Sequence, residues 1–185
     1  MSDDATLNEF IDNSGDSTES GSATEDYQDT GDLQTLETSP IEDWKLVRLD
    51  DILSFEYGDN LPANTRQEGS IPVYGSNGQV DTHTEANVDS EGIIIGRKGS
   101  IGKGEFSDKP FWAIDTTYYI SDEETDENLR FIYYLLQDME LERLNAASAI
   151  PGLNRNDAYN LNTLVPPLSE QRKIATVLHT VDQAI

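Results

Sequence analysis

Residues 93–104 read IIIGRKGSIGKG, and this stretch decides how the rest of the chain is interpreted. Three consecutive β-branched residues predict a buried strand. The glycines that follow permit a tight turn and the close approach of another backbone. We therefore expect a rigid strand that presents Arg97, Lys98, Ser100 and Lys103 on a narrow loop suited to phosphate groups or base edges. A plain β-hairpin with solvated lysines fits the same pattern.

Two nucleotide-binding motifs are excluded by their spacing. A Walker A loop has a glycine separated by four residues from Gly-Lys-Ser/Thr. Here that position holds Arg97, and Lys103 is followed by Gly104. A dinucleotide fingerprint needs a third glycine three residues after Gly104, where the sequence has Ser107.

The composition bounds the class of protein. The chain has 185 residues and a net charge of −24. It has no cysteine, so disulfides and thiolate metal sites are excluded. It has no apolar run of about 20 residues and no basic, apolar leader, which predicts a cytoplasmic location.

Residues 1–43 hold 13 acids and no base, yet the remaining residues still carry a net charge of −11. An acidic surface poor in lysine is typical of a protein kept soluble in concentrated salt, which suggests a halophilic source. A protein that simply avoids polyanions fits equally well. This charge is the main argument against a nucleic-acid partner.

Composition and periodicity divide the chain into three parts. Residues 1–43 are predicted to be a disordered acidic tail, because so few apolar side chains cannot offset the entropy of ordering. Residues 44–168 form the predicted domain, and 169–185 begin a long helix capped by Ser169. Within the domain, strands are predicted at 44–49, 71–74, 112–120 and 161–165, and turns at 57–60 and 75–78. A helical turn is predicted at 50–53, and a hairpin over 106–111 with its turn near 108–110. A helix is predicted over 129–144, capped by Asp126 or Asn128.

The last helix carries apolar residues at positions i, i+3, i+4, i+7 and i+11. This spacing predicts a coiled-coil face for pairing with another subunit. The residues are Ile174, Val177, Leu178, Val181 and Ile185.

Four stretches together resemble a known family: residues 71–78, 94–102, 114–119 and 148–175. In this order and spacing they are similar to a target recognition domain of the DNA specificity subunit of type I restriction–modification systems. The resemblance implies an α+β fold with a twisted mixed β-sheet and few helices. It also implies a non-catalytic DNA-binding protein that reads one half of a split site and docks methyltransferase subunits.

The resemblance places S-adenosylmethionine in the methyltransferase subunits and ATP with Mg²⁺ in a restriction subunit, so no cofactor is expected in this chain. Full-length family members have two recognition domains and two long helices, whereas this chain has one domain and the start of one helix. The resemblance therefore leaves three alternatives open, which are a fragment, a decayed gene and a half-subunit that pairs with a second copy through its last helix. The acidic tail is no part of the family pattern.

Eight residues, seven of them on the matching stretches and Lys103 directly after one, are candidates for contact with double-stranded DNA. Guanidinium and ammonium groups suit phosphates, while amide and guanidinium groups suit base edges. Tyr74 is expected to stack or to contact a sugar. The candidates are Tyr74, Ser76, Asn77, Arg97, Lys98, Lys103, Asn154 and Arg155. The alternatives are a simple hairpin turn at 76–78 and a packed corner at 150–153.

No catalytic constellation is present in the sequence. The two prolines at 166–167 lack the flanking residues of a methyltransferase motif, and His83 and His179 are isolated. The alternative function is an acidic protein-interaction adaptor that uses its last helix. That reading predicts that the loops around Arg97 and Arg155 point apart, whereas DNA binding predicts that one face holds both.

Overall fold

The computed structural model describes residues 43–145 and 152–184, which all belong to the second of the two units of the chain, Thr38–Ile185. Its strands are β1 (Lys45–Arg48), β2 (Glu56–Tyr57), β3 (Ile71–Gly75), β4 (Gly78–His83), β5 (Gly92–Gly96), β6 (Gly104–Ser107), β7 (Trp112–Ala113), β8 (Thr117–Ile120) and β9 (Asn162–Val165). Its helices are α1 (Leu129–Asp138), α2 (Arg155–Tyr159) and α3 (Leu168–Asp182), with short 3₁₀ turns at Leu49–Asp51, Ala63–Thr65 and Leu141–Asn145.

Strand β5 is buried along its whole length, as its run of isoleucines predicted. It lies inside a four-stranded sheet with the order β2-β8-β5-β6, in which all neighbours are antiparallel. Ile93 and Ile95 pack into the main core with Ile132 of α1, whereas Ile94 packs into a second cluster with Phe111. Both faces of the strand are therefore covered, which explains a continuous apolar run in place of an alternating one.

A second sheet has the order β4-β3-β7, and its β3–β7 pair is parallel. The predicted mixed-sheet α+β fold is thus confirmed. The expected single strand over 112–120 is wrong, because the chain breaks after β7 and crosses to the first sheet as β8. Ile114 still donates its N–H to Tyr74, but its carbonyl turns back to accept from Thr117.

The predicted hairpin over 106–111 is also wrong. Strand β6 pairs with β5, while β7 pairs with β3, so the two segments lie in different sheets. The actual hairpins are β3–β4, with its turn at 76–77, and β5–β6, with the loop at 97–103. The sequence signal at 108–110 marks a turn, but the chain does not fold back on itself there.

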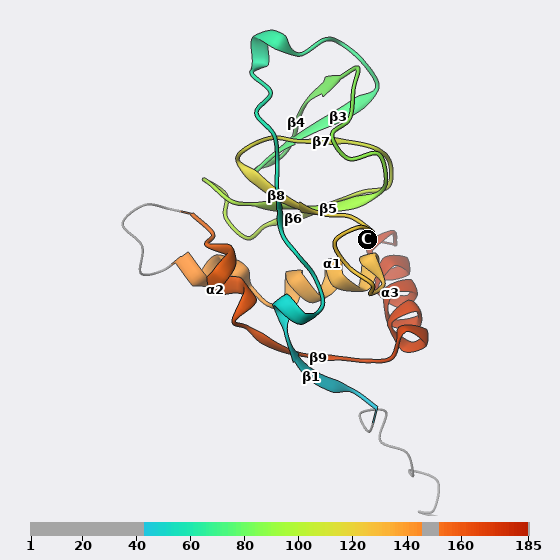
Figure 1. The fold of residues 1–185 in the computed structure, drawn as a ribbon. Coiled ribbons are helices and arrows are strands. Elements are labelled where there is room, and N and C mark those ends of the chain that lie inside the picture. Colours follow the sequence, from blue (N-terminus) through green and yellow to red (C-terminus); the bar gives the residue numbers. More distant parts are fainter. Residues whose placement is uncertain (1–42, 146–151, 185) are drawn as a thin grey trace, which may run out of the picture. The chain divides into compact units, whose positions relative to one another are not determined.

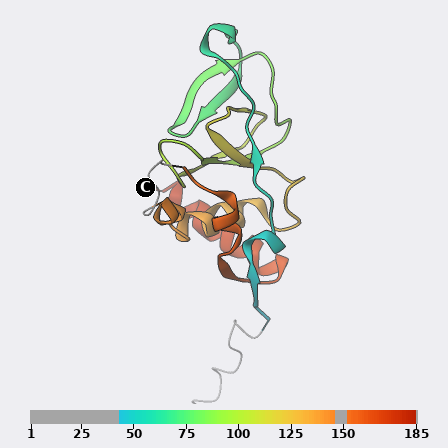
Figure 2. The same ribbon diagram turned by 60° about the vertical axis from the view of Figure 1, so that its left-hand side comes forward.

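A separate two-stranded sheet joins the two ends of the domain. Strands β1 and β9 are antiparallel, and β9 leads directly into α3. Helix α3 lies beside α1 (Figure 1, Figure 2), where Ala175 is buried and the side chain of Gln171 accepts from the N–H of Asn128. The helix begins at Leu168 with Pro167 as its N-cap, so the predicted cap Ser169 lies one residue inside it.

Helix α1 begins as predicted, with the side chain of Asn128 accepting from the N–H of Phe131. It ends at Asp138, earlier than the predicted residue 144, because Glu140 adopts a φ of 48°. Helical φ is negative, so the chain continues only as a 3₁₀ turn. Helix α2 was not predicted; the side chain of Asn154 caps it.

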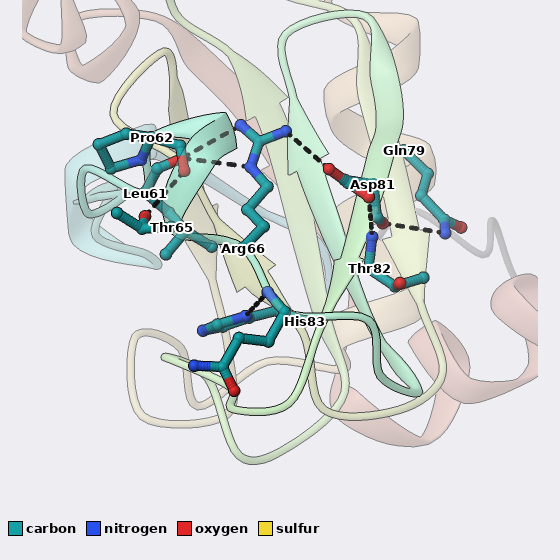
Figure 3. A network of polar contacts seen from close by, with 9 residues as sticks. Leu61, Pro62, Thr65, Arg66, Gln79, Asp81, Thr82 and His83 are labelled. Carbon is teal, nitrogen blue, oxygen red and sulfur yellow. Dashed lines mark hydrogen bonds and ion pairs between the residues drawn. The ribbon is translucent and has the colours of Figure 1, made fainter.

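Polar contacts join the segment 61–70 to the β3–β4 hairpin (Figure 3). Arg66 donates from Nε and Nη2 to the carbonyl of Leu61 at 3.2 and 3.1 Å, and from Nη1 to Asp81 at 3.3 Å. Buried His83 accepts from the N–H of Gln67 through Nδ1. These bonds join residues 66 and 67 to β4, the second strand of the hairpin.

Candidate nucleic-acid interface

Two loops meet at the break between β7 and β8. The carbonyl of Thr116 accepts from the N–H groups of Arg97 at 2.9 Å and Lys98 at 3.1 Å, and also from the hydroxyl of Ser76. The β3–β4 turn and the β5–β6 loop are thus bonded to one backbone oxygen. The strand predicted over 112–120 is interrupted here, since Thr116 lies between β7 and β8 and its carbonyl bonds to the two loops.

Gly96 is required for this meeting. A Cβ at this position would lie 1.9 Å from the carbonyl oxygen of Ser100 and 3.1 Å from that of Ser76. The loop after Gly96 folds back so closely that the N–H of Gly102 donates to the carbonyl of Gly96 at 2.9 Å. Gly102 itself has a φ of +72°, which favours glycine.

A third segment, distant in sequence, joins the same place. Leu153 donates its N–H to the carbonyl of Arg97 at 2.8 Å, and Gly152 forms an isolated bridge with Lys98. The hydroxyl of Tyr118 donates to the carbonyl of Leu153 at 3.0 Å. Arg155, which follows directly, is therefore brought beside the β5–β6 loop.

The guanidinium groups of Arg97 and Arg155 converge on one aromatic ring. Their Cζ atoms lie 5.0 and 4.9 Å from the centroid of Tyr57, so they lie within about 10 Å of each other. Tyr118 lies on the neighbouring strand, with its ring 5.1 Å from Tyr57. We call Tyr57, Arg97, Tyr118 and Arg155 the arginine–tyrosine cluster.

Hydrogen bonds to carbonyls hold both arginines without neutralising them. Arg97 donates to the backbone oxygen of Asp115 at 2.6 Å, and Arg155 to that of Phe55 at 3.2 Å. Neither forms an ion pair with a described residue. Burial, followed by the neighbouring Tyr57, raises the pKa of Tyr118 to about 12, so this ring carries no charge at neutral pH.

The exposed candidates lie on the β3–β4 turn and the β5–β6 loop, the two loops that bond to the carbonyl of Thr116. Lys98 pairs with the carboxylate of Asp115 at 3.3 Å, and both side chains are about half exposed. Lys103 and Asn77 are exposed, and Asn77 accepts from the hydroxyl of Ser100 at 3.2 Å. These side chains are free to reach a ligand from the loops that carry them.

Three other predicted residues take part in the packing or hydrogen bonding of the fold. Tyr74 is half-buried, with its ring edge-on to Phe111 at 5.9 Å. Ser76 donates to Thr116, and Asn154 caps α2 through a bond from the N–H of Asn156. Each of these residues helps to build the surface, and a direct role in binding stays a prediction.

Sequence reasoning missed Tyr57. It was assigned to a turn over 57–60, but it lies on β2, opposite Tyr118 in the antiparallel register. A strand of two residues gives no periodic signal, so the pattern offered nothing to detect it. Only the pairing of β2 with β8 brings Tyr57 to Arg97 and Arg155.

The apolar stripe of α3 is partly exposed. Val177, Leu178 and Val181 are exposed, whereas Ile174 packs against the core. Ile185 lies outside the described residues. In the described part of the chain no helix is long and apolar enough to span a membrane, and no group of three metal-binding side chains occurs.

Comparison with known proteins places these features in a family. The model of the type I restriction modification DNA specificity domain matches residues 41–185. The chain belongs to this family. As the resemblance implied, the family is one of DNA specificity domains and not of catalytic domains.

Individual relatives agree with this membership. The Type I restriction enzyme EcoprrI specificity subunit of Escherichia coli is 28% identical over 144 residues, which are 75% of this chain and 36% of that protein. The S subunit of the type I restriction–modification system from M. genitalium has the same fold, with a TM-score of 0.65 at 24% identity over 77% of this chain and 40% of that one. The HsdS subunit from Thermoanaerobacter tengcongensis has a TM-score of 0.57 at 18% identity over 82% and 40%. The chain thus spans about two fifths of the length of these relatives.

Proposed function

We propose that this chain binds double-stranded DNA and reads one half of a split recognition site for a type I restriction–modification system. The observation that carries the proposal is the convergence of Arg97 and Arg155 on Tyr57. Segments separated by more than 50 residues in sequence bring together two guanidinium groups that form no ion pair with a described residue. Family membership supplies the context in which such a cluster reads DNA.

The chemistry of the cluster suits this task. A guanidinium has five N–H donors in a planar fork, and each arginine gives one N–H to a carbonyl. Donors therefore remain for a guanine edge or for phosphate oxygens. Lys98 and Lys103 provide point charges for the phosphate backbone, and Asn77 provides an amide for a base edge.

The net charge of −24 restricts how the protein binds. Each phosphate contact contributes about 0.9 to the slope of log affinity against log salt, so molar salt removes most of the electrostatic attraction. Binding in a salt-rich cell would then depend on base contacts, shape and partner subunits. The concentration of cations in one cluster lets an acidic protein approach DNA locally.

The same proposal includes the partner subunits. The chain docks methyltransferase subunits that hold S-adenosylmethionine, and through them the restriction subunit that uses ATP and Mg²⁺. It needs no cofactor of its own. The exposed face of α3 suits either these subunits or a second copy of the chain.

The adaptor alternative required the loops around Arg97 and Arg155 to point apart. They lie beside the same ring, which supports DNA binding over that alternative. The exposed face of α3 favours an interaction role in either case, so it does not separate the two.

Binding is tested by titrating the full chain, with and without methyltransferase subunits, into a labelled pool of random duplexes. Bound duplexes are then sequenced. We expect an enriched half-site, and we expect Arg97→Ala and Arg155→Ala each to weaken binding at least tenfold. Arg48→Ala is the matched control, because Arg48 is exposed and paired with Asp50. Absence of binding at every salt concentration would overturn the proposal.

A second measurement uses the cell. Sequencing of methylated adenines with the gene present and deleted should show one split motif that disappears with the gene. An unchanged methylation pattern, together with purified protein that selects no duplex, would support the adaptor.

A further inference from the structure

The position of Tyr57 is unusual for a tyrosine that anchors two charged side chains. It lies on β2, a strand of two residues at the edge of the four-stranded sheet, and its residue is 46% exposed. Neighbouring Phe55 is fully buried and belongs to the main core. The core therefore holds the strand through Phe55, while the ring of Tyr57 stays at the surface with the two arginines.

Two guanidinium groups within about 10 Å repel each other, and the one carbonyl that each binds leaves its charge in place. The face of an aromatic ring carries negative charge density and attracts a cation within about 6 Å of its centroid. Tyr57 satisfies this distance for both arginines at once. In the described residues no carboxylate pairs with either arginine, so the ring is the group that they share.

The hydrogen bonds of Arg97 leave its orientation incompletely determined. Its Nη2 donates to Asp115, but its Nε is buried without an acceptor among the described residues. A guanidinium fixed by one hydrogen bond can still swing about that bond. Contact with the rings of Tyr57 and Tyr118, at 5.0 and 5.7 Å, removes this freedom.

We propose that Tyr57 is a positioning residue for DNA recognition, whose ring sets the spacing and orientation of the guanidinium groups of Arg97 and Arg155. This inference rests on the proposed function. It assigns the ring, and not the hydroxyl, as the acting group. Fixed donors discriminate between base edges because a displaced fork cannot make both bonds of a bidentate contact.

Two substitutions separate the ring from the hydroxyl. Tyr57→Phe keeps the ring, and Tyr57→Leu removes it while keeping an apolar side chain. Tyr134→Leu is the matched control, because Tyr134 also has a neighbouring tyrosine ring but lies on α1 and bonds to Asp182. The full-length chain is titrated with the random duplex pool and with the half-site that the wild type selects.

We expect Tyr57→Leu to bind the selected half-site at least tenfold more weakly and to lose most of its preference over the random pool. Tyr57→Phe should stay within about threefold of the wild type, since aromatic rings of both kinds attract cations. Tyr134→Leu should bind normally. Wild-type affinity and selectivity in Tyr57→Leu, or equal losses in Leu and Phe variants, would overturn the inference while leaving the proposed function intact.

A measurement without DNA tests the positioning directly. In nuclear magnetic resonance spectra the side-chain resonances of Arg97 and Arg155 should be shifted by the ring current of Tyr57. The shifts should persist in Tyr57→Phe. In Tyr57→Leu the shift of Arg155 should collapse, and that of Arg97 should fall to the part that the ring of Tyr118 contributes from 5.7 Å, with an unchanged thermal midpoint. If the arginine resonances do not respond to loss of the ring, the inference fails even where DNA binding has not been detected.

Discussion

Replacing Gly96 by alanine should damage the candidate interface, because Gly96 ends β5 where the β5–β6 loop folds back onto it. The new Cβ would lie 1.9 Å from the carbonyl oxygen of Ser100, whereas ordinary carbon–oxygen contacts are about 3.3 Å or longer. The oxygen must therefore move by about 1.4 Å, with no flexible side chain to absorb the shift. The β5–β6 loop has to open.

The cost follows from what the opening breaks. Gly96 donates to the carbonyl of Lys103 and accepts from the N–H of Gly102, both at 2.9 Å. Two lost hydrogen bonds at about 1 kcal/mol each, with overpacking strain of about 1–3 kcal/mol, give about 3–5 kcal/mol in the free energy of unfolding. With a urea dependence of about 2 kcal/mol per molar, the unfolding midpoint should fall by about 2 M.

Urea unfolding followed by circular dichroism measures this change, and duplex binding below the transition measures its effect on the interface. Gly75→Ala is the matched control. The nearest atoms to a Cβ there are side-chain atoms of Val80, Ile114 and Thr116 at 3.3, 3.4 and 3.7 Å, and the stability of the variant should stay within about 1 kcal/mol of the wild type.

The reasoning would be refuted in either of two ways. A wild-type midpoint in Gly96→Ala would mean that the loop accepts a methyl group where the structure leaves no space. Lost stability with normal DNA binding would mean that the loop that carries Arg97 does not form the interface.

Three further predictions concern the core, the pH dependence and α3. Ile132→Ala should lower the free energy of unfolding by about 2–5 kcal/mol in urea titrations, because Ile132 is fully buried; a loss below about 1 kcal/mol would contradict the packing described. The pKa of Tyr118 is raised from 10.0 to about 12, so its neutral form favours the fold at every pH below 10, and this contribution is lost as the pH rises through about 12. Alkaline unfolding should therefore be less steep in Tyr118→Phe, and identical profiles would argue against it. Val181→Asp should abolish any self-association seen by sedimentation, since Val181 is exposed on the apolar face of α3; unchanged association would place the contact elsewhere.

The sequence pattern predicted the elements whose signal lies within their own residues. The isoleucines of β5, the apolar stripe of α1 and its cap at Asn128 are local signals, and each was confirmed. The errors occur where the chain changes partner. Residues 112–120 have strand composition throughout, but nothing local shows that Ala113 ends a strand of one sheet and Thr117 begins a strand of another.

The candidate interface likewise contains residues with a local sequence signal and residues whose role depends on long-range pairing. Glycines and cations in residues 96–103 marked the loop, because a tight turn needs particular residues. Tyr57 escaped notice because its role depends on strand β2 meeting β8, which is a long-range pairing. DNA binding predicts that Arg97 and Arg155 converge, and only the folded backbone determines whether they do.

The carbonyl of Thr116 has a consequence for how such a protein acquires new targets. The bonds that fix residues 97, 98 and 153 run between backbone atoms, so they do not depend on which side chains those positions carry. Exchange of the outward-facing groups therefore alters the chemistry offered to a ligand while the supporting frame persists. In such a scaffold, selection in the laboratory or in nature can change the binding specificity by substituting a few outward-facing residues.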